Sequence, residues 1–187
     1  MEKEQIQKYR KRYSILKIIP SQYEKPILVA LSKFPELKYV RIHFKLVSKG
    51  SAAYYTTPSA ASFVRPTEHR TYYVYILENA AFPESAALFK NLDFEEQEAV
   101  IAHELSHVLE FNKRSAAQLL KMALLFTIPR FKRTIERAAD MAAIEHGFGK
   151  GLYRHAIYLR SIPGYLKKRP DLNKYYLKPS EILAHLK

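Results

Sequence analysis

The chain has 187 residues, of which 48% are hydrophobic and 13% aromatic, so a folded core is available and intrinsic disorder is excluded. It contains no Cys, which rules out disulfides and thiolate chemistry, and its formal net charge is +13. No apolar run reaches the ~18 residues of a membrane-spanning helix, and the charged N-terminus lacks an apolar signal-peptide core, so we expect a soluble cytoplasmic protein.

The positive charge lies mainly in the two ends of the chain. We expect one domain, 1–187, with a basic N-terminal segment at 1–25 and a basic tail at 163–187. Basic ends are typical of a solvated exterior, and they would also suit an anionic partner, either nucleic acid or a membrane surface. No nucleic-acid fold motif accompanies the charge.

The first half of the chain predicts two helices followed by two strands. Apolar residues at helical spacing predict a helix within 3–18, and a second, short helix is predicted over 24–34. Alternating and β-branched or aromatic residues predict strands over 39–47 and 70–77. The segment 48–70 between these strands has the composition of a loop.

The second half of the chain predicts helices only. Asp93, with a capping-box glutamate three residues later, marks the start of the first. Further helices are predicted over 115–128, over 131–146 with Gly147 as its stop, and over 151–162. Sparse strands followed by helices are typical of an α+β fold.

The motif that carries chemistry is an HExxH at His103-Glu104-Leu105-Ser106-His107. Two His four residues apart lie on one face of a helix, so both imidazoles can reach one Zn²⁺ at about 2.1 Å. Glu104 lies beside the first ligand, where it can take a proton from a water molecule at the metal. The alternative is a surface helix with two solvated His.

A catalytic zinc needs a third protein ligand, and a carboxylate must serve because no Cys exists and no His follows His107 closely. The best candidate is Glu136. Asp140, four residues later on the same helix face, would accept the other ring N–H of a ligand His and fix its tautomer. The alternative is that this acidic pair forms surface salt bridges with Arg133 or Arg137.

Other residues compete for the role of third ligand. Glu181, in the tail, ranks second. The remaining competitors are Glu110, Glu145 and His146.

The pattern resembles the gluzincin zinc metallopeptidases, in which HExxH on one helix is completed by the Glu of an ExxxD on the next. Residues 92–109 resemble the active-site helix of HtpX-like and CAAX-endopeptidase-like enzymes, and the segment ERAADMAAIEHG resembles their second motif. Ser106 stands where many relatives have Gly, and the multi-pass membrane helices of those enzymes are missing from this sequence. The shorter ImmA/IrrE-like gluzincins, which act on repressors, are an equal comparison.

The resemblance implies a zincin-like metallopeptidase fold, with a small N-terminal sheet packed on the active-site helix and on a following glutamate-bearing helix. It also implies that the strand before the active-site helix is a sheet edge that pairs with an extended substrate, a role for residues 70–77. An ordinary core strand is the alternative. Such families stabilise the developing oxyanion with a downstream side chain, and the candidates here are His146, Tyr153, His155, Tyr158 and Tyr176.

The apolar helix at 115–128 separates the two metal motifs. We expect it to be buried over the active-site helix. The alternative is a membrane-surface anchor flanked by basic residues, and Lys121 in its middle argues against a membrane span.

These observations favour a zinc-dependent endopeptidase acting on a peptide or protein substrate, with Zn²⁺ held by His103, His107 and Glu136. Glu104 would be the catalytic base, and Asp140 would support a ligand His. The alternative is a non-catalytic basic zinc-binding module that binds nucleic acid or an anionic surface.

Overall fold

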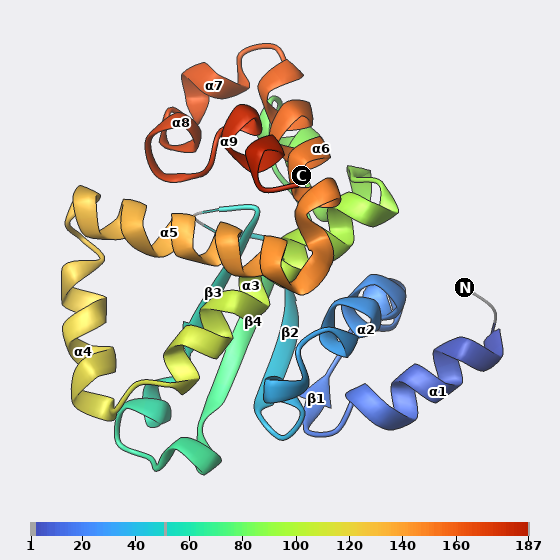
Figure 1. Ribbon diagram of the computed structural model, residues 1–187, viewed down its shortest axis with the longest axis vertical. Coiled ribbons are helices and arrows are strands. Elements are labelled where there is room, and N and C mark those ends of the chain that lie inside the picture. The colour runs from blue at the N-terminus through green and yellow to red at the C-terminus, as the bar shows by residue number, and fades with distance from the viewer. Residues whose placement is uncertain (1–2, 51, 187) are drawn as a thin grey trace.

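The computed structural model describes residues 3–50 and 52–186. Strands occur only in the first half of this described chain, and helices dominate the second half, so the fold is α+β (Figure 1). The helices and strands are α1 (Lys3–Tyr13), β1 (Lys17–Ile18), α2 (Glu24–Ser32), β2 (Arg41–Val47), β3 (Tyr54–Pro58), β4 (Thr71–Leu77), α3 (Phe94–Asn112), α4 (Ala116–Leu125), α5 (Pro129–Ala143), α6 (Gly149–Ser161), α7 (Tyr165–Lys168), α8 (Asp171–Tyr175) and α9 (Pro179–Ala184).

The four strands form one mixed sheet in the order β1-β2-β4-β3. β1, β2 and β4 run parallel, whereas β3 runs antiparallel to β4. Val74 of β4 lies between Phe44 of β2 and Thr56 of β3. β4 is therefore an internal strand, and β3 is an edge of the sheet.

This topology corrects two expectations from the sequence. The segment 48–70 is not a plain loop, because it contains β3. The strand at 70–77 is internal, and the two edges of the sheet are β1 and β3. β3 was not predicted because the short run Tyr-Tyr-Thr-Thr-Pro does not alternate between apolar and polar residues and ends in Pro; in the structure all five residues are half-buried.

One face of the sheet is buried and the other is not. Alternate residues of β2 and β4 point into a core that they share with the apolar sides of α2 and α3, which lie over this face (Figure 1). On the opposite face the rings of Tyr55 and Tyr75 stack with centroids 4.7 Å apart. The sheet side chains of the core are Ile42, Phe44, Tyr72, Val74 and Ile76.

The long helix α3 begins as its sequence predicts. The Asp93 side chain accepts from the backbone N–H of Glu96 at 2.9 Å, and the Glu96 carboxylate accepts from the backbone N–H of Asp93 at 3.1 Å. Helix α6 packs closely on this first turn, because a Cβ at Gly151 would lie 2.2 Å from the backbone oxygen of Glu95. The capping box and this close approach fix where α3 starts and how it lies against α6.

Helix α4 is not the buried helix that its apolar sequence predicts. Only Leu119 and Met122 are buried, whereas Leu120 and Leu124 are 57% and 67% exposed. The helix packs against the turn Ala60–Phe63, and Leu120 and Leu124 point away from these contacts into solvent. The expectation that this helix is buried over the active-site helix is therefore wrong.

Other predicted boundaries shift by a few residues. The first helix ends at Tyr13 and not near residue 18, because Lys17 enters β1 and donates its ammonium to the carbonyls of Leu37 and Val40 at 2.9 and 2.7 Å. The helix predicted at 131–146 runs from Pro129 to Ala143. Among residues 3–50 and 52–186, no helix has the length and hydropathy that crossing a membrane requires.

Candidate metal centre

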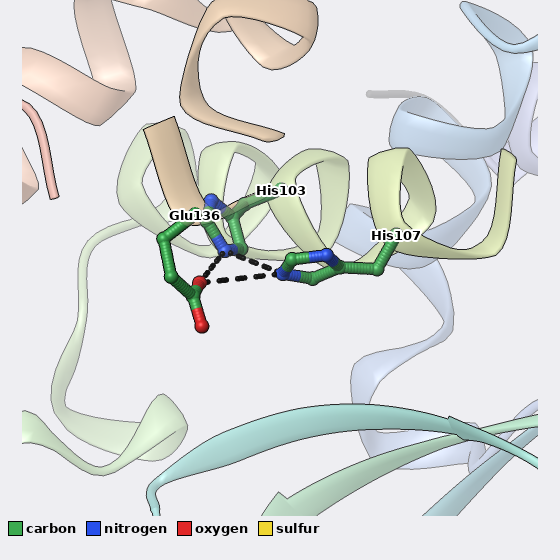
Figure 2. Close-up of side chains that lie close together, drawn as sticks. All are labelled: His103, His107 and Glu136. Carbon is green, nitrogen blue, oxygen red and sulfur yellow. Dashed lines mark hydrogen bonds and ion pairs between the residues drawn. The ribbon is translucent and has the colours of Figure 1, made fainter. Parts of the chain in front are cut away.

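Three side chains from two helices converge at one point (Figure 2). Nε2 of His103 lies 3.1 Å from Nε2 of His107, one turn further along α3. Oε2 of Glu136, on α5, lies 3.3 Å from the first nitrogen and 3.4 Å from the second. The three atoms therefore form a nearly equilateral triangle.

The size of this triangle fits a metal ion. In a tetrahedral site with bonds of about 2.1 Å, neighbouring ligand atoms lie about 3.4 Å apart. The separations of 3.1, 3.3 and 3.4 Å between His103, His107 and Glu136 match that spacing. Two imidazole nitrogens and one carboxylate oxygen are also a donor set that Zn²⁺ accepts, so the residues fit a divalent ion such as zinc.

Burial and charge define the electrostatics of the cluster. His103 and His107 are each 8% exposed, and Glu136 is 5% exposed. Burial opposes protonation of His103, but its hydrogen bonds with Asp140 and Glu136 prevail and raise the pKa of His103 well above the usual value. Burial likewise opposes ionisation of Glu136, yet its contacts with the two imidazoles hold the pKa of this carboxyl well below the usual range. A metal ion at the cluster would thus replace a proton.

Asp140 orients the first histidine, as its spacing from Glu136 on α5 predicts. Its Oδ1 lies 2.9 Å from Nδ1 of His103, so this ring turns Nε2 toward the triangle. Its Oδ2 accepts a hydrogen bond from the backbone N–H of Leu177 at 2.8 Å. The tail of the chain thereby reaches the cluster through Asp140, and Leu177 is a contact that the sequence did not suggest.

Glu104 is held by the edge strand. Its carboxylate is buried, and Oε2 accepts a hydrogen bond from the hydroxyl of Thr56 on β3 at 2.7 Å. The same hydroxyl lies 3.2 Å from the backbone oxygen of Glu104. Sequence reasoning missed Thr56, because no sequence signal links a residue in an unpredicted strand to a helix 48 positions away.

A mainly apolar cavity of about 100 Å³ adjoins His103 and Glu104. Two of the five oxyanion candidates line it, His155 and Tyr176. The Tyr176 ring lies 5.8 Å from the His103 ring, centroid to centroid. Nδ1 of His155 is buried and has no hydrogen-bond partner within the described chain.

The other oxyanion candidates lie elsewhere. His146 stacks on Phe34 at a centroid distance of 3.9 Å, and its Nδ1 lies 2.7 Å from the backbone oxygen of Ala142 on α5. Tyr158 donates to the backbone oxygen of Ala86 at 3.1 Å, and Tyr153 packs against the core. Of the five candidates for the oxyanion donor, only His155 and Tyr176 therefore lie at the cavity beside His103 and Glu104.

The competing carboxylates are not part of the cluster of His103, His107 and Glu136. Glu181 forms a two-point ion pair with Arg137, with distances of 2.7 and 3.1 Å. Glu110 pairs with Arg114, and Glu145 is exposed. Arg137 therefore pairs with a residue of the tail. Glu136 and Asp140 contact the two His residues and do not form the surface salt bridges that were the alternative.

Comparison of the chain with protein-family models, with curated proteins and with solved structures finds no match. The buried triad on two helices is consistent with a zincin-like HExxH-plus-Glu site on its own geometry.

Proposed function

We propose that this chain is a zinc-dependent endopeptidase of the gluzincin type. The observation that carries the proposal is the triangle of His103, His107 and Glu136 atoms, with Glu104 buried directly beside the first ligand. A structural zinc site needs four protein ligands, whereas three ligands and an adjacent carboxylate are the donor set of a hydrolytic site. Within the described chain, the metal-binding group has three members.

His103, His107 and Glu136 would hold the ion, and Asp140 would keep Nε2 of His103 directed at it. When bound, Zn²⁺ would supply Lewis-acid chemistry, which lowers the pKa of water and polarises a carbonyl group. Asp140 is itself fixed by the N–H of Leu177, so the ring orientation depends on the folded tail.

Glu104 is the general base of the proposed reaction. Its carboxylate takes a proton as water oxygen attacks the carbonyl carbon of the scissile peptide, and it returns that proton to the leaving nitrogen as the C–N bond breaks. Thr56 holds one carboxylate oxygen at 2.7 Å, which leaves the other oxygen to face the reactants. Tyr176 and His155 line the adjoining cavity and are the donors available for the developing oxyanion.

The substrate would bind along β3. This strand pairs with β4 on one side only among the described residues, so its other side presents free backbone N–H and C=O groups. An extended peptide can add to such an edge as a further strand. Since Thr56 of β3 touches Glu104, a peptide on this edge would pass the catalytic carboxylate.

The test is zinc analysis together with hydrolysis of a mixture of fluorogenic peptides. We expect one zinc per chain, peptide cleavage that a chelator removes, and a Glu104→Gln variant that keeps its zinc but loses cleavage by at least a thousandfold. Glu136→Ala should lose zinc. Glu110→Gln, which alters a carboxylate on the same helix outside the cluster, is the matched control.

Normal hydrolysis by Glu104→Gln would overturn the assigned base. Stoichiometric zinc in Glu136→Ala would move the third ligand to another residue. Zinc binding with no hydrolysis of any peptide would instead favour the non-catalytic zinc module.

A further inference from the structure

Helix α4 and the turn that follows it carry exposed aliphatic side chains. Leu120, Leu124 and Ile128 follow one another at four-residue intervals and are 57%, 67% and 48% exposed. Helix α4 lies at the margin of the molecule, beyond the ends of α3 and α5 (Figure 1). Several exposed large apolar side chains in one short segment are typical of an interaction surface.

The same segment is strongly basic. Residues 113–133 contain six Lys or Arg and no Asp or Glu, so they hold nearly half of the net charge of +13. Arg114 pairs with Glu110, and the other five cations form no ion pair with any residue of the described ranges. These five are Lys113, Lys121, Arg130, Lys132 and Arg133.

Together, the two features match a helix that lies in a lipid interface. Aliphatic chains of such a helix enter the boundary between headgroups and acyl chains, while Lys and Arg on its flanks contact phosphate groups. Nucleic acid would use the cations but leave three aliphatic side chains in water. The combination of charge and apolar surface therefore points to an anionic bilayer.

We propose that α4 and its basic flanks bind the surface of anionic phospholipid membranes, with Leu120, Leu124 and Ile128 inserted into the interface. The surface is distinct from the basic ends of the chain, which the charge count alone suggests as the anionic contact. It does not depend on the proposed peptidase activity. Helix α4 also forms one wall of a groove of about 610 Å³ that reaches His107, so membrane binding would bring this groove close to lipid.

The chain has no Trp, so a single introduced Trp reports its own environment. We expect the Leu124→Trp fluorescence to shift to shorter wavelength with vesicles of phosphatidylcholine and phosphatidylglycerol, and not with phosphatidylcholine alone. Tyr39→Trp, at a 66% exposed position away from α4 and the turn that packs on it, is the control and should not shift. A Leu124→Trp spectrum that vesicles leave unchanged, or that shifts only with a nucleic acid or an acidic peptide, would overturn the proposal.

Vesicle sedimentation separates the contributions of charge and apolar contact. The triple variant Leu120→Ser, Leu124→Ser, Ile128→Ser should bind anionic vesicles at least tenfold more weakly, and Lys121→Glu with Arg133→Glu should do the same. Lys11→Glu with Lys167→Glu removes the same charge from the two ends and should bind as the unaltered chain does. Vesicle binding that is lost on changing the two ends and kept on changing α4 would refute the proposal. Circular dichroism spectra equal to that of the unaltered chain show that each variant folds.

Discussion

The hydroxyl of Thr56 donates a hydrogen bond of 2.7 Å to Oε2 of Glu104, and so joins the edge strand β3 to the proposed catalytic base on α3. The contact is between residues 48 positions apart, and both residues are at least half-buried. A buried carboxylate needs such a donor to keep a hydrogen-bond partner and a single orientation.

Replacing Thr56 by Val should therefore impair catalysis without releasing metal. Val has nearly the same shape, so the change removes one hydrogen bond to a charged group, an interaction of about 1.5–3 kcal/mol. We expect kcat/KM for peptide cleavage to fall by about ten- to a hundredfold. Thr57→Val, the next residue of the strand, is the control, and full activity of Thr56→Val would show that the hydroxyl does not position Glu104.

Asp140→Asn should weaken metal binding. The variant keeps the size of the side chain but replaces the carboxylate oxygen that lies 2.9 Å from Nδ1 of His103. Loss of such a partner typically lowers metal affinity by about ten- to a hundredfold. Competition with a fluorescent chelator measures the change. Glu145→Gln, an exposed carboxylate, should leave the affinity as it is, and an Asp140→Asn affinity equal to that of the unaltered chain would contradict the role given to Asp140.

Tyr176→Phe tests the oxyanion donor. Burial and the nearby carboxylates raise the pKa of Tyr176 well above its usual value, so its phenol stays protonated and able to donate. If Tyr176 is the donor, kcat should fall by about tenfold to a hundredfold with little change in KM or in zinc content. Tyr158→Phe, whose hydroxyl meets the backbone of Ala86, is the control, and an unchanged kcat for Tyr176→Phe would leave His155 as the candidate.

Gly151→Ala should destabilise the fold through the contact between α3 and α6. The added Cβ would lie 2.2 Å from the backbone oxygen of Glu95, so one helix must move. We expect the free energy of unfolding to fall by about 3 kcal/mol in urea titrations. Gly164→Ala is the control, because a Cβ there meets no atom within 4 Å and the change bears only the cost of a positive φ of 77°, about 1 kcal/mol. An equal loss of stability in both variants would argue against the close approach of α6 to α3.

The stability of the protein should also depend on Glu98. Burial, reinforced by Glu95 and opposed by Lys25, raises the pKa of Glu98 to about 7, above the value of about 4.3 in an unfolded chain. Folding therefore favours the protonated carboxyl, and the resulting penalty is absent below about pH 4 and complete above about pH 8.

Glu98→Gln should remove that penalty. After allowance for solvent screening of this half-buried group, we expect a gain of about 1 kcal/mol in the free energy of unfolding at pH 8 and none at pH 4. Glu68→Gln, at an exposed position, is the control. A gain of the same size at both pH values would show that ionisation of Glu98 is not its source.

Prediction from the sequence succeeded where the evidence is local. The capping box of Asp93 and Glu96 lies within four residues, and the spacing of His103 and His107 places both rings on one helix face regardless of the rest of the fold. The lack of Cys and of a nearby third His limits the third ligand to a carboxylate, and Glu136 is the best candidate because Asp140 follows it on the same helix face. The structure brings its carboxylate to within 3.4 Å of both imidazoles.

Predictions failed where a residue's environment depends on distant segments. The edge strand β3 has no periodic pattern, and its place beside β4 follows from pairing that only the assembled sheet defines. Helix α4 has the composition of a buried helix, yet its Leu120 and Leu124 are exposed. Hydropathy records what a side chain would gain by burial, and it does not record whether a partner surface is present.

The amino-acid sequence by itself determined the helix that carries His103, Glu104 and His107, and the restriction of metal ligands to imidazole and carboxylate. Tertiary structure decided which strand faces the site, which donors hold Glu104 and Asp140, and which apolar helix stays uncovered. The division has a physical reason. Helical periodicity and capping act over three or four residues, whereas Thr56 meets Glu104 and Leu177 meets Asp140 only because the folded backbone brings segments 48 and 37 residues apart into hydrogen-bond distance.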